Sequence, residues 1–150
     1  MPASFEASLP GLHFSPSLWT DNGPDITLHY AANGTAYIED YYQPLTPQGS
    51  NASLNIQWKY NATVAHIEKA ISSYPDSLFW TFASSTNVGN TPPDTPIIQA
   101  LGNGSLTPEG GVNQKLLPYL KGLQKGSRVG IVMFDFFETP AGLVDALLAL

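Results

Sequence analysis

Residues 128–135 read Arg-Val-Gly-Ile-Val-Met-Phe-Asp, and this stretch decides the fold class. Six consecutive uncharged residues, rich in Val, Ile and Phe, separate Arg128 from Asp135. A short apolar run of this kind is typical of a strand that is covered on both faces, as in a parallel sheet. A carboxylate is costly to bury without a partner. Asp135, which ends the run, is therefore the first candidate for chemistry in the sequence.

Two more strands are expected upstream. Residues 35–42, Thr-Ala-Tyr-Ile-Glu-Asp-Tyr-Tyr, are rich in β-forming residues and are stopped by Pro44 and Pro47. Residues 77–83, Ser-Leu-Phe-Trp-Thr-Phe-Ala, form a nearly continuous apolar run, which predicts a strand covered on both faces. Residues 1–34 are crowded with turn signals and read as an irregular segment with one short strand over 25–30.

Helical spacing separates the strands. Over residues 58–74 apolar side chains recur at steps of three and four, which predicts a helix that ends before Pro75; its apolar face is Tyr60, Val64, Ile67, Ile71 and Tyr74. Residues 113–124 are also predicted to be helical, with Asn113 as the cap and Pro118 as a kink or a sign of a later start.

The remaining segments are a long loop and a last helix. Residues 84–111 are rich in Gly, Pro and Asn, and loops of this length are usually functional or disordered. Pro140 fits the first turn of a helix in which Leu143, Leu147 and Leu150 share a face. Apolar strands that alternate with helices predict an α/β fold with a parallel sheet of right-handed βαβ units.

Composition excludes several classes of protein. The 150 residues fit one domain, and a net charge of −6 argues against nucleic acid as a partner. The absence of cysteine excludes a disulfide scaffold, a thiolate zinc site and a cysteine nucleophile. No apolar run approaches the length of a membrane span, and residues 1–7 lack the features of a signal peptide. Four glycosylation sequons nevertheless favour a secretory origin, and they begin at Asn33, Asn51, Asn61 and Asn103.

Polar groups follow all three long strands at their carboxyl ends, where parallel α/β folds bind ligands. Asp40 and Tyr42 stand at i and i+2 of the first strand, residues 84–87 follow the second, and Asp135 follows the third. The alternatives are structural: Asp135 accepts hydrogen bonds from the next loop or caps the last helix, and Asp40 and Tyr42 form a solvated strand end.

The histidines are weaker candidates than these strand ends. His66 flanks the apolar face of the predicted helix and is expected to be partly buried or on the surface, while His13 and His29 lie in the irregular N-terminal segment. No histidine stands at a strand end, where a general base is expected.

Four stretches in order resemble the C-terminal half of the phosphatidylinositol-specific phospholipase C family, nearest to the bacterial and fungal phospholipase C-like phosphodiesterases. They are Ile-Glu-Asp-Tyr-Tyr (38–42), Leu-Phe-Trp-Thr-Phe-Ala-Ser-Ser (78–85), Val-Asn-Gln-Lys-Leu-Leu-Pro-Tyr-Leu (112–120) and Arg-Val-Gly-Ile-Val-Met-Phe-Asp-Phe (128–136). The resemblance covers residues 35–150 and implies about three βα units of an irregular (β/α)8 barrel. Such a barrel needs at least about 200 residues, so residues 1–150 are expected to form a partial barrel domain.

The resemblance also implies roles for single residues. In that family one histidine is the general base for the inositol 2-hydroxyl, a second histidine protonates the diacylglycerol leaving group, and an arginine steadies the phosphate. Asp135 would hold and support the base, Asp40 would bond to inositol hydroxyls and Tyr42 would stack on the ring. No histidine of this sequence matches the two catalytic ones, and Arg128 begins its strand at the wrong end for the phosphate. The chain is therefore expected to be a truncated copy that is inactive alone.

The resemblance further implies a phosphoinositide-type lipid or another phosphodiester as substrate and a secreted location. Transient membrane contact would use an apolar rim, with Trp19, Trp58 and residues 84–111 as candidates. No cofactor is expected, and calcium stays open. The alternative function is a non-catalytic α/β module that binds a partner or associates with itself, because open sheet edges invite association.

Overall fold

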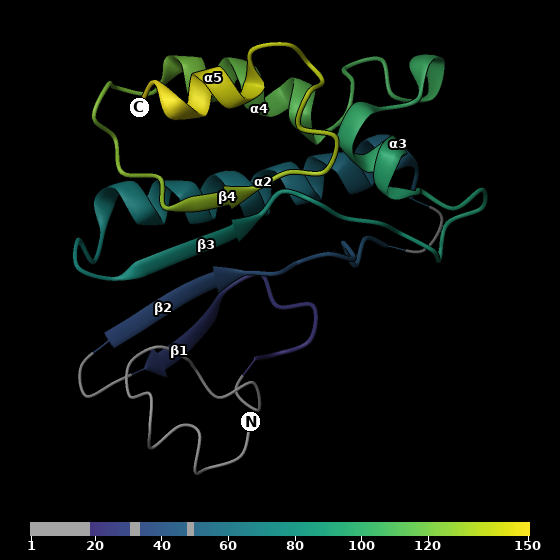
Figure 1. The fold of residues 1–150 in the computed structure, drawn as a ribbon. Coiled ribbons are helices and arrows are strands. Elements are labelled where there is room, and N and C mark those ends of the chain that lie inside the picture. Colours follow the sequence, from purple (N-terminus) through teal and green to yellow (C-terminus); the bar gives the residue numbers. More distant parts are fainter. Residues whose placement is uncertain (1–18, 31–33, 48–49) are drawn as a thin grey trace.

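The computed structural model describes residues 19–30, 34–47 and 50–150. Its elements in chain order are β1 (Ile26–Tyr30), β2 (Gly34–Glu39), α2 (Ala52–Ser72), β3 (Leu78–Phe82), α3 (Pro96–Leu101), the 3-10 helix η2 (Gly104–Leu106), α4 (Val112–Gly122), β4 (Ile131–Met133) and α5 (Leu143–Leu148). The strands form one sheet in the order β1-β2-β3-β4 (Figure 1). β2, β3 and β4 are parallel, which confirms the predicted α/β class. β1 pairs with β2 in the antiparallel direction, an arrangement that the sequence did not predict.

The two faces of the sheet have different neighbours. Alternate side chains of a strand point to opposite faces. On one face, Phe79 and Thr81 of β3 contact α2 through His66, and a buried core joins α2, α4 and α5 next to them; it consists of Ile56, Ala83, Val112, Leu116, Leu120, Leu143 and Ala146. On the other face, side chains of β1, β2 and β3 pack together without a described helix over them; they are Ile26, Leu28, Ala36, Ile38, Leu78, Trp80 and Phe82. We call this second face the helix-free face.

The structure corrects the predicted burial of residues 128–134. Only Ile131–Met133 join the ladder, and the side chains of Ile131 and Met133 are 49% and 44% exposed. Both belong to the helix-free face, because Val132 and Phe134 between and after them pack against the helical core. Within the described residues β4 pairs with β3 alone, so its outer edge is open. The apolar run is a strand, but only one of its faces is covered.

The predicted helix over 58–74 begins six residues earlier than expected, at Ala52. Asn51 caps it, because its side chain accepts a hydrogen bond of 3.0 Å from the N–H of Leu54. The predicted apolar face is only partly right. Tyr60 and Val64 pack against the core and Ile67 is buried, but Ile71 and Tyr74 are exposed. Polar side chains are buried on this helix instead, namely Asn55, Lys59, Thr63 and His66.

Residues 84–111 are not one structureless loop, because α3 and η2 lie within them. The predicted helix over 113–124 runs from Val112 to Gly122, passes through Pro118 and has Gly111, not Asn113, at its cap position. The last helix begins at Leu143 rather than at Pro140, which lies in the preceding turn. Leu143 is buried and Leu147 is half-buried, as their shared spacing predicted.

Arg128 holds the amino ends of β3 and β4 together. Its guanidinium donates to the carbonyl of Ser77 at 3.0 Å, just before β3. It also donates to three carbonyls at the end of α2, those of Ala70, Ser73 and Tyr74, at 2.9, 3.2 and 2.9 Å. The single arginine of the sequence therefore caps a helix far from the carboxyl edge of the sheet.

Candidate active site

The polar candidates lie at one edge of the sheet, past the carboxyl ends of β2 and β4. Asp40 directly follows β2, and Asp135 comes two residues after β4. By alternation, Asp40, which directly follows β2, shares the helix-free side with Ile38. Asp135 lies in the bend that follows β4. β3 lies between β2 and β4, so two strand spacings, about 10 Å, separate their backbones.

Asp40 is half-buried and is held from two directions. Its Oδ2 accepts a hydrogen bond of 2.7 Å from Nε1 of Trp19, and its own N–H donates to the carbonyl of Gly23 at 2.8 Å. The Trp19 indole meets Trp80 and Phe82 edge-on, with ring centroids 5.8 and 6.3 Å away. Trp19 therefore joins Asp40 to the aromatic surface of β3.

Tyr42 presents both a ring and a hydroxyl. Its hydroxyl donates to Oδ1 of Asp21 at 2.8 Å, and the side chain is 37% exposed. The bond to Asp21 raises the pKa of the Tyr42 phenol above its usual value of 10.0, with smaller contributions from burial and from the charges of Asp21 and Asp40. Tyr42 is therefore a neutral phenol at physiological pH, with part of its surface open to a ligand.

Asp135 shows neither of the two structural alternatives. α5 has Gly142 at its cap position without a side-chain cap bond, so Asp135 does not cap it. Within residues 19–30, 34–47 and 50–150, the Asp135 carboxylate makes no hydrogen bond, although its backbone is held firmly. The buried amide of Asn113 donates to the carbonyls of Asp135, Phe136 and Thr139 at 2.9, 3.3 and 3.0 Å. Asn113 is thus an anchor for the loop after β4 and not the helix cap that its position suggested.

The third polar stretch, residues 84–87, is largely engaged in structural contacts. Ser85 is buried and its hydroxyl lies 3.1 Å from Oε1 of Gln99 in α3. The Asn87 amide donates to Oδ1 of Asn55 in α2 at 3.0 Å, and Asn55 donates to Asp94 at 2.6 Å. These bonds tie the loop after β3 to α2, so this stretch supports the edge of the sheet.

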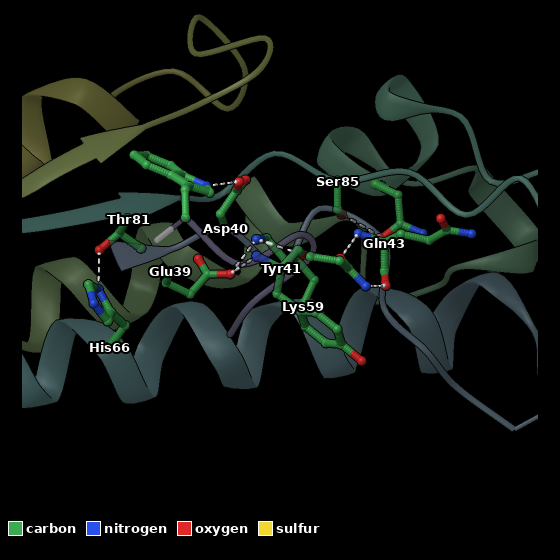
Figure 2. A network of polar contacts seen from close by, with 11 residues as sticks. Glu39, Asp40, Tyr41, Gln43, Lys59, His66, Thr81 and Ser85 are labelled. Carbon is green, nitrogen blue, oxygen red and sulfur yellow. Dashed lines mark hydrogen bonds and ion pairs between the residues drawn. The ribbon is translucent and has the colours of Figure 1, made fainter. Parts of the chain in front are cut away.

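A buried ion pair lies on the other side of β2 from Asp40, and sequence reasoning missed it. Nζ of Lys59 is 2.6 Å from Oε1 of Glu39 and donates to the carbonyl of Tyr41 at 3.0 Å; both charged side chains are fully buried (Figure 2). Burial raises the pKa of Glu39 and lowers that of Lys59, while the attraction within the pair opposes both shifts. The sequence could have indicated a buried Glu39, because neighbouring residues of a strand point to opposite faces, so that Glu39 faces α2 when Asp40 faces away from it. The pair fixes the backbone that carries Asp40 and Tyr42.

The histidines are away from the candidate carboxylates. His66 is 3% exposed, with Nδ1 2.8 Å from the Thr81 hydroxyl between α2 and β3, so it is more deeply buried than predicted (Figure 2). His29 is exposed on β1. His13 and the sequon at Asn33 lie outside the described residues. In the described part of the chain no group of three or more His, Cys, Asp or Glu side chains is placed to hold a metal ion.

Large apolar side chains are exposed in the segments that follow the strands. Leu45 follows β2, and Phe136 and Phe137 follow β4, at 67%, 45% and 54% exposure. The segment after β3 adds Val88, Ile97 and Leu106. Of the predicted rim residues, Trp58 is exposed on α2, whereas Trp19 is half-buried on the sheet. None of the helices in the described ranges is long and apolar enough to cross a bilayer.

Solved structures with a similar chain path include phospholipases. One mutant of the phosphatidylinositol-specific phospholipase C from Staphylococcus aureus superposes with a TM-score of 0.67 at 18% identity, over 93% of this chain and 41% of that one. The fold is similar to part of the fold of phosphatidylinositol-specific phospholipase C. A double mutant of the same enzyme gives a TM-score of 0.60 at 16% identity, and a form that carries pentafluoro-Phe gives 0.59 at 17%.

This likeness concerns the fold alone, because the identity is low. The chain spans less than half the length of these solved structures, which is consistent with part of a barrel. No family model matches the sequence. No curated protein matches it either.

Proposed function

We propose that this chain is part of a phosphoric diester hydrolase of the phosphatidylinositol phospholipase C type, and that it cleaves no substrate alone. One observation carries the proposal: in a phospholipase C-like fold, Asp40 and Tyr42 follow the carboxyl end of β2, and Asp135 follows the carboxyl end of β4, at the same edge of the sheet. This is where barrel enzymes place their catalytic groups.

Each group fits a step of phosphodiester cleavage. Oδ1 of Asp40, which has no hydrogen-bond partner in the described ranges, bonds to hydroxyls of an inositol ring, and the exposed ring of Tyr42 packs on the apolar face of that inositol ring. Asp135, without a protein partner in the described ranges, supports an imidazolium while a proton moves. The base and acid themselves are supplied by polypeptide outside the described ranges, because His29 and His66 lie elsewhere.

Membrane contact and secretion belong to the same proposal. The exposed Leu45, Phe136 and Phe137 extend from the edge that would receive a lipid headgroup, so they form an apolar rim. Such a rim inserts between headgroups and gains about 25 cal/mol for each Å² of apolar surface that leaves water. The sequons at Asn51, Asn61 and Asn103 are exposed, as glycosylation in a secretory compartment requires.

The test compares two preparations on phosphatidylinositol vesicles. The recombinant 150-residue chain is expected to bind these vesicles more tightly than phosphatidylcholine vesicles and to release no inositol phosphate. The protein captured from its natural source, with the polypeptide it carries there, is expected to release inositol phosphate and diacylglycerol. Normal turnover by the recombinant chain overturns the claim of inactivity. Absence of both binding and turnover in the two preparations overturns the proposed function.

The helix-free face favours a second candidate, a non-catalytic binding or self-associating module. Ile131 and Met133 are exposed there beside the open edge of β4. A monomer that melts cooperatively and ignores phosphatidylinositol favours the self-sufficient module. A closed dimer that melts cooperatively also favours the module, whereas open-ended association that grows with concentration, together with binding of the dye ANS, favours a barrel portion with exposed core. Sedimentation and calorimetry of the recombinant chain distinguish the two.

A further inference from the structure

Residues 19–23 run alongside residues 40–43 and bond to them almost residue by residue. Trp19 donates to Asp40, Tyr42 donates to Asp21, and the N–H of Asp40 donates to the carbonyl of Gly23. Asn22 closes a pair of bonds with the backbone of Gln43: its amide donates to the Gln43 carbonyl, and its Oδ1 accepts from the Gln43 N–H, each at 2.8 Å. We call residues 19–23 the strap. It precedes β1, in a segment where the sequence indicated only turns.

The strap reaches the two side chains that the proposed function assigns to substrate binding. We propose that Trp19 and Asp21 are positioning residues, which hold the Asp40 carboxylate and the Tyr42 phenol in the geometry that receives a polyhydroxylated ring. The inference rests on the proposed function and adds the groups that make its binding site rigid. Among the described residues each positioning side chain makes one side-chain hydrogen bond, and its partner is a group that the proposed function assigns to ligand binding.

The contacts leave the binding groups available. The Trp19 indole occupies only Oδ2 of Asp40, and in the described residues Oδ1 of that carboxylate has no hydrogen-bond partner. Asp21 accepts a hydrogen bond from the Tyr42 hydroxyl, while 37% of the Tyr42 side chain stays exposed. A strap that blocked the site would cover both groups. This strap bonds to both groups and leaves part of each available.

The Trp19 indole is itself fixed, so it can act as a reference point. Trp80 and Phe82 hold its ring in edge-on contacts, and Trp80 stacks on Phe82 with centroids 5.3 Å apart. A carboxylate that is bonded to a rigid donor loses its rotamer freedom before the ligand arrives. Ligand binding then avoids that entropic cost, which is the usual benefit of preorganisation.

The test separates the ring of Trp19 from its N–H group. Trp19→Phe keeps an aromatic ring on Trp80 and removes the donor to Asp40. Asp21→Ala removes the acceptor of the Tyr42 hydroxyl, whereas Asp21→Asn keeps an oxygen in the same place. Asp76→Ala is the matched control, because Asp76 is an exposed carboxylate in the turn between α2 and β3, at the opposite edge of the sheet.

The probe is myo-inositol, titrated into the 15N-labelled chain by NMR. Trp19→Phe is expected to weaken the affinity about tenfold, the usual order for one hydrogen bond to a charged group. Asp21→Ala is expected to weaken it several-fold, while Asp21→Asn and Asp76→Ala stay within twofold of wild type. All four variants are expected to keep the melting temperature within a few degrees. Wild-type affinity in both Trp19→Phe and Asp21→Ala overturns the inference, and so does a gain in affinity, which would make the strap a block.

A second measurement separates this inference from the proposed function. In the ligand-free protein, Asp40→Ala is expected to shift the Nε1–H resonance of Trp19 far more than those of Trp58 and Trp80. An unmoved Trp19 resonance overturns the inference whatever the chain binds. If wild type ignores myo-inositol while this resonance moves as expected, the proposed ring-binding function fails, and the orientation of Asp40 by Trp19 is nonetheless supported.

Discussion

Acidification is expected to weaken the fold through one buried imidazole. His66 is 3% exposed between α2 and β3, and its Nε2 has no hydrogen-bond partner among the residues that the structure describes. Burial lowers the pKa of His66 from 6.5 to about 4; the charge of Asp25 opposes this shift, and Lys69 and Lys59 add to it. A proton on this ring would be a buried charge in a place without an acceptor for it.

The size and the sign follow from the two pKa values. The difference between 6.5 and about 4 is about 2.5 pKa units, and at about 1.36 kcal/mol per unit it corresponds to about 3 kcal/mol. Below pH 6.5 His66 is mostly protonated in the unfolded chain, whereas in the folded protein it becomes protonated only near pH 4. The free energy of unfolding therefore falls as the pH decreases through this window. By pH 5 the loss relative to pH 7 is about 2 kcal/mol.

Urea denaturation at pH 7, 6 and 5 measures this loss. The comparison is with His66→Gln, which keeps a polar group near Thr81 and does not titrate, so the other titrating groups cancel. The wild-type free energy of unfolding is expected to fall by about 2 kcal/mol more than that of the variant between pH 7 and pH 5. His29→Gln, at an exposed position on β1, is the control and is expected to follow wild type. Parallel pH profiles for wild type and His66→Gln would refute the reasoning.

Three further perturbations test other parts of the fold. Lys59→Met leaves Glu39 buried without its cation and is expected to lower the free energy of unfolding, measured in urea, by about 3–5 kcal/mol. The double variant Lys59→Met, Glu39→Leu is expected to recover most of that loss. Equal losses in the single and the double variant would contradict a role for the pair. Arg128→Ala removes the donors to four carbonyls and is expected to lower the free energy of unfolding by about 2–3 kcal/mol, with Arg128→Lys intermediate. A loss under about 0.5 kcal/mol would show that these four hydrogen bonds are dispensable. Expression in a eukaryotic secretory host is expected to add a glycan at exposed Asn61, so Asn61→Gln removes one glycan from the intact mass; an unchanged mass contradicts its use.

The parallel strands were predictable because their residues leave few alternatives. Three β-forming runs, of which one is stopped by Pro44 and another ends at Asp135, are separated from one another by helical spacings, so the α/β class follows from local pattern. Burial was harder to predict. The run before Asp135 looks like a fully buried strand, yet the exposure of Ile131 and Met133 depends on which strands stand beside β4, and local sequence does not contain that information.

In the candidate site, too, the residues that follow from local sequence were predicted and those that depend on distant contacts were not. Asp40, Tyr42 and Asp135 were found because strand ends can be located from sequence, and the structure places all three at one edge of the sheet. Trp19 was considered only as a rim residue and Asp21 was not considered, because each reaches its partner across 21 positions of sequence, with only a turn motif before β1. Their roles, like those of the three predicted residues, stay predictions for the experiments above.

The anchor at Asn113 limits how the loop after β4 can be exchanged. One amide group, with two hydrogens, serves three carbonyls that lie 22, 23 and 26 positions further along the chain. Phe136, in the middle of that loop, has a positive φ of 52°, a conformation that L-residues rarely adopt without such support. Insertions or deletions between residues 135 and 139 would move at least one carbonyl out of reach. Transplanting this loop into another barrel therefore requires the first turn of α4 as well, because Asn113 in that turn holds the loop in its conformation.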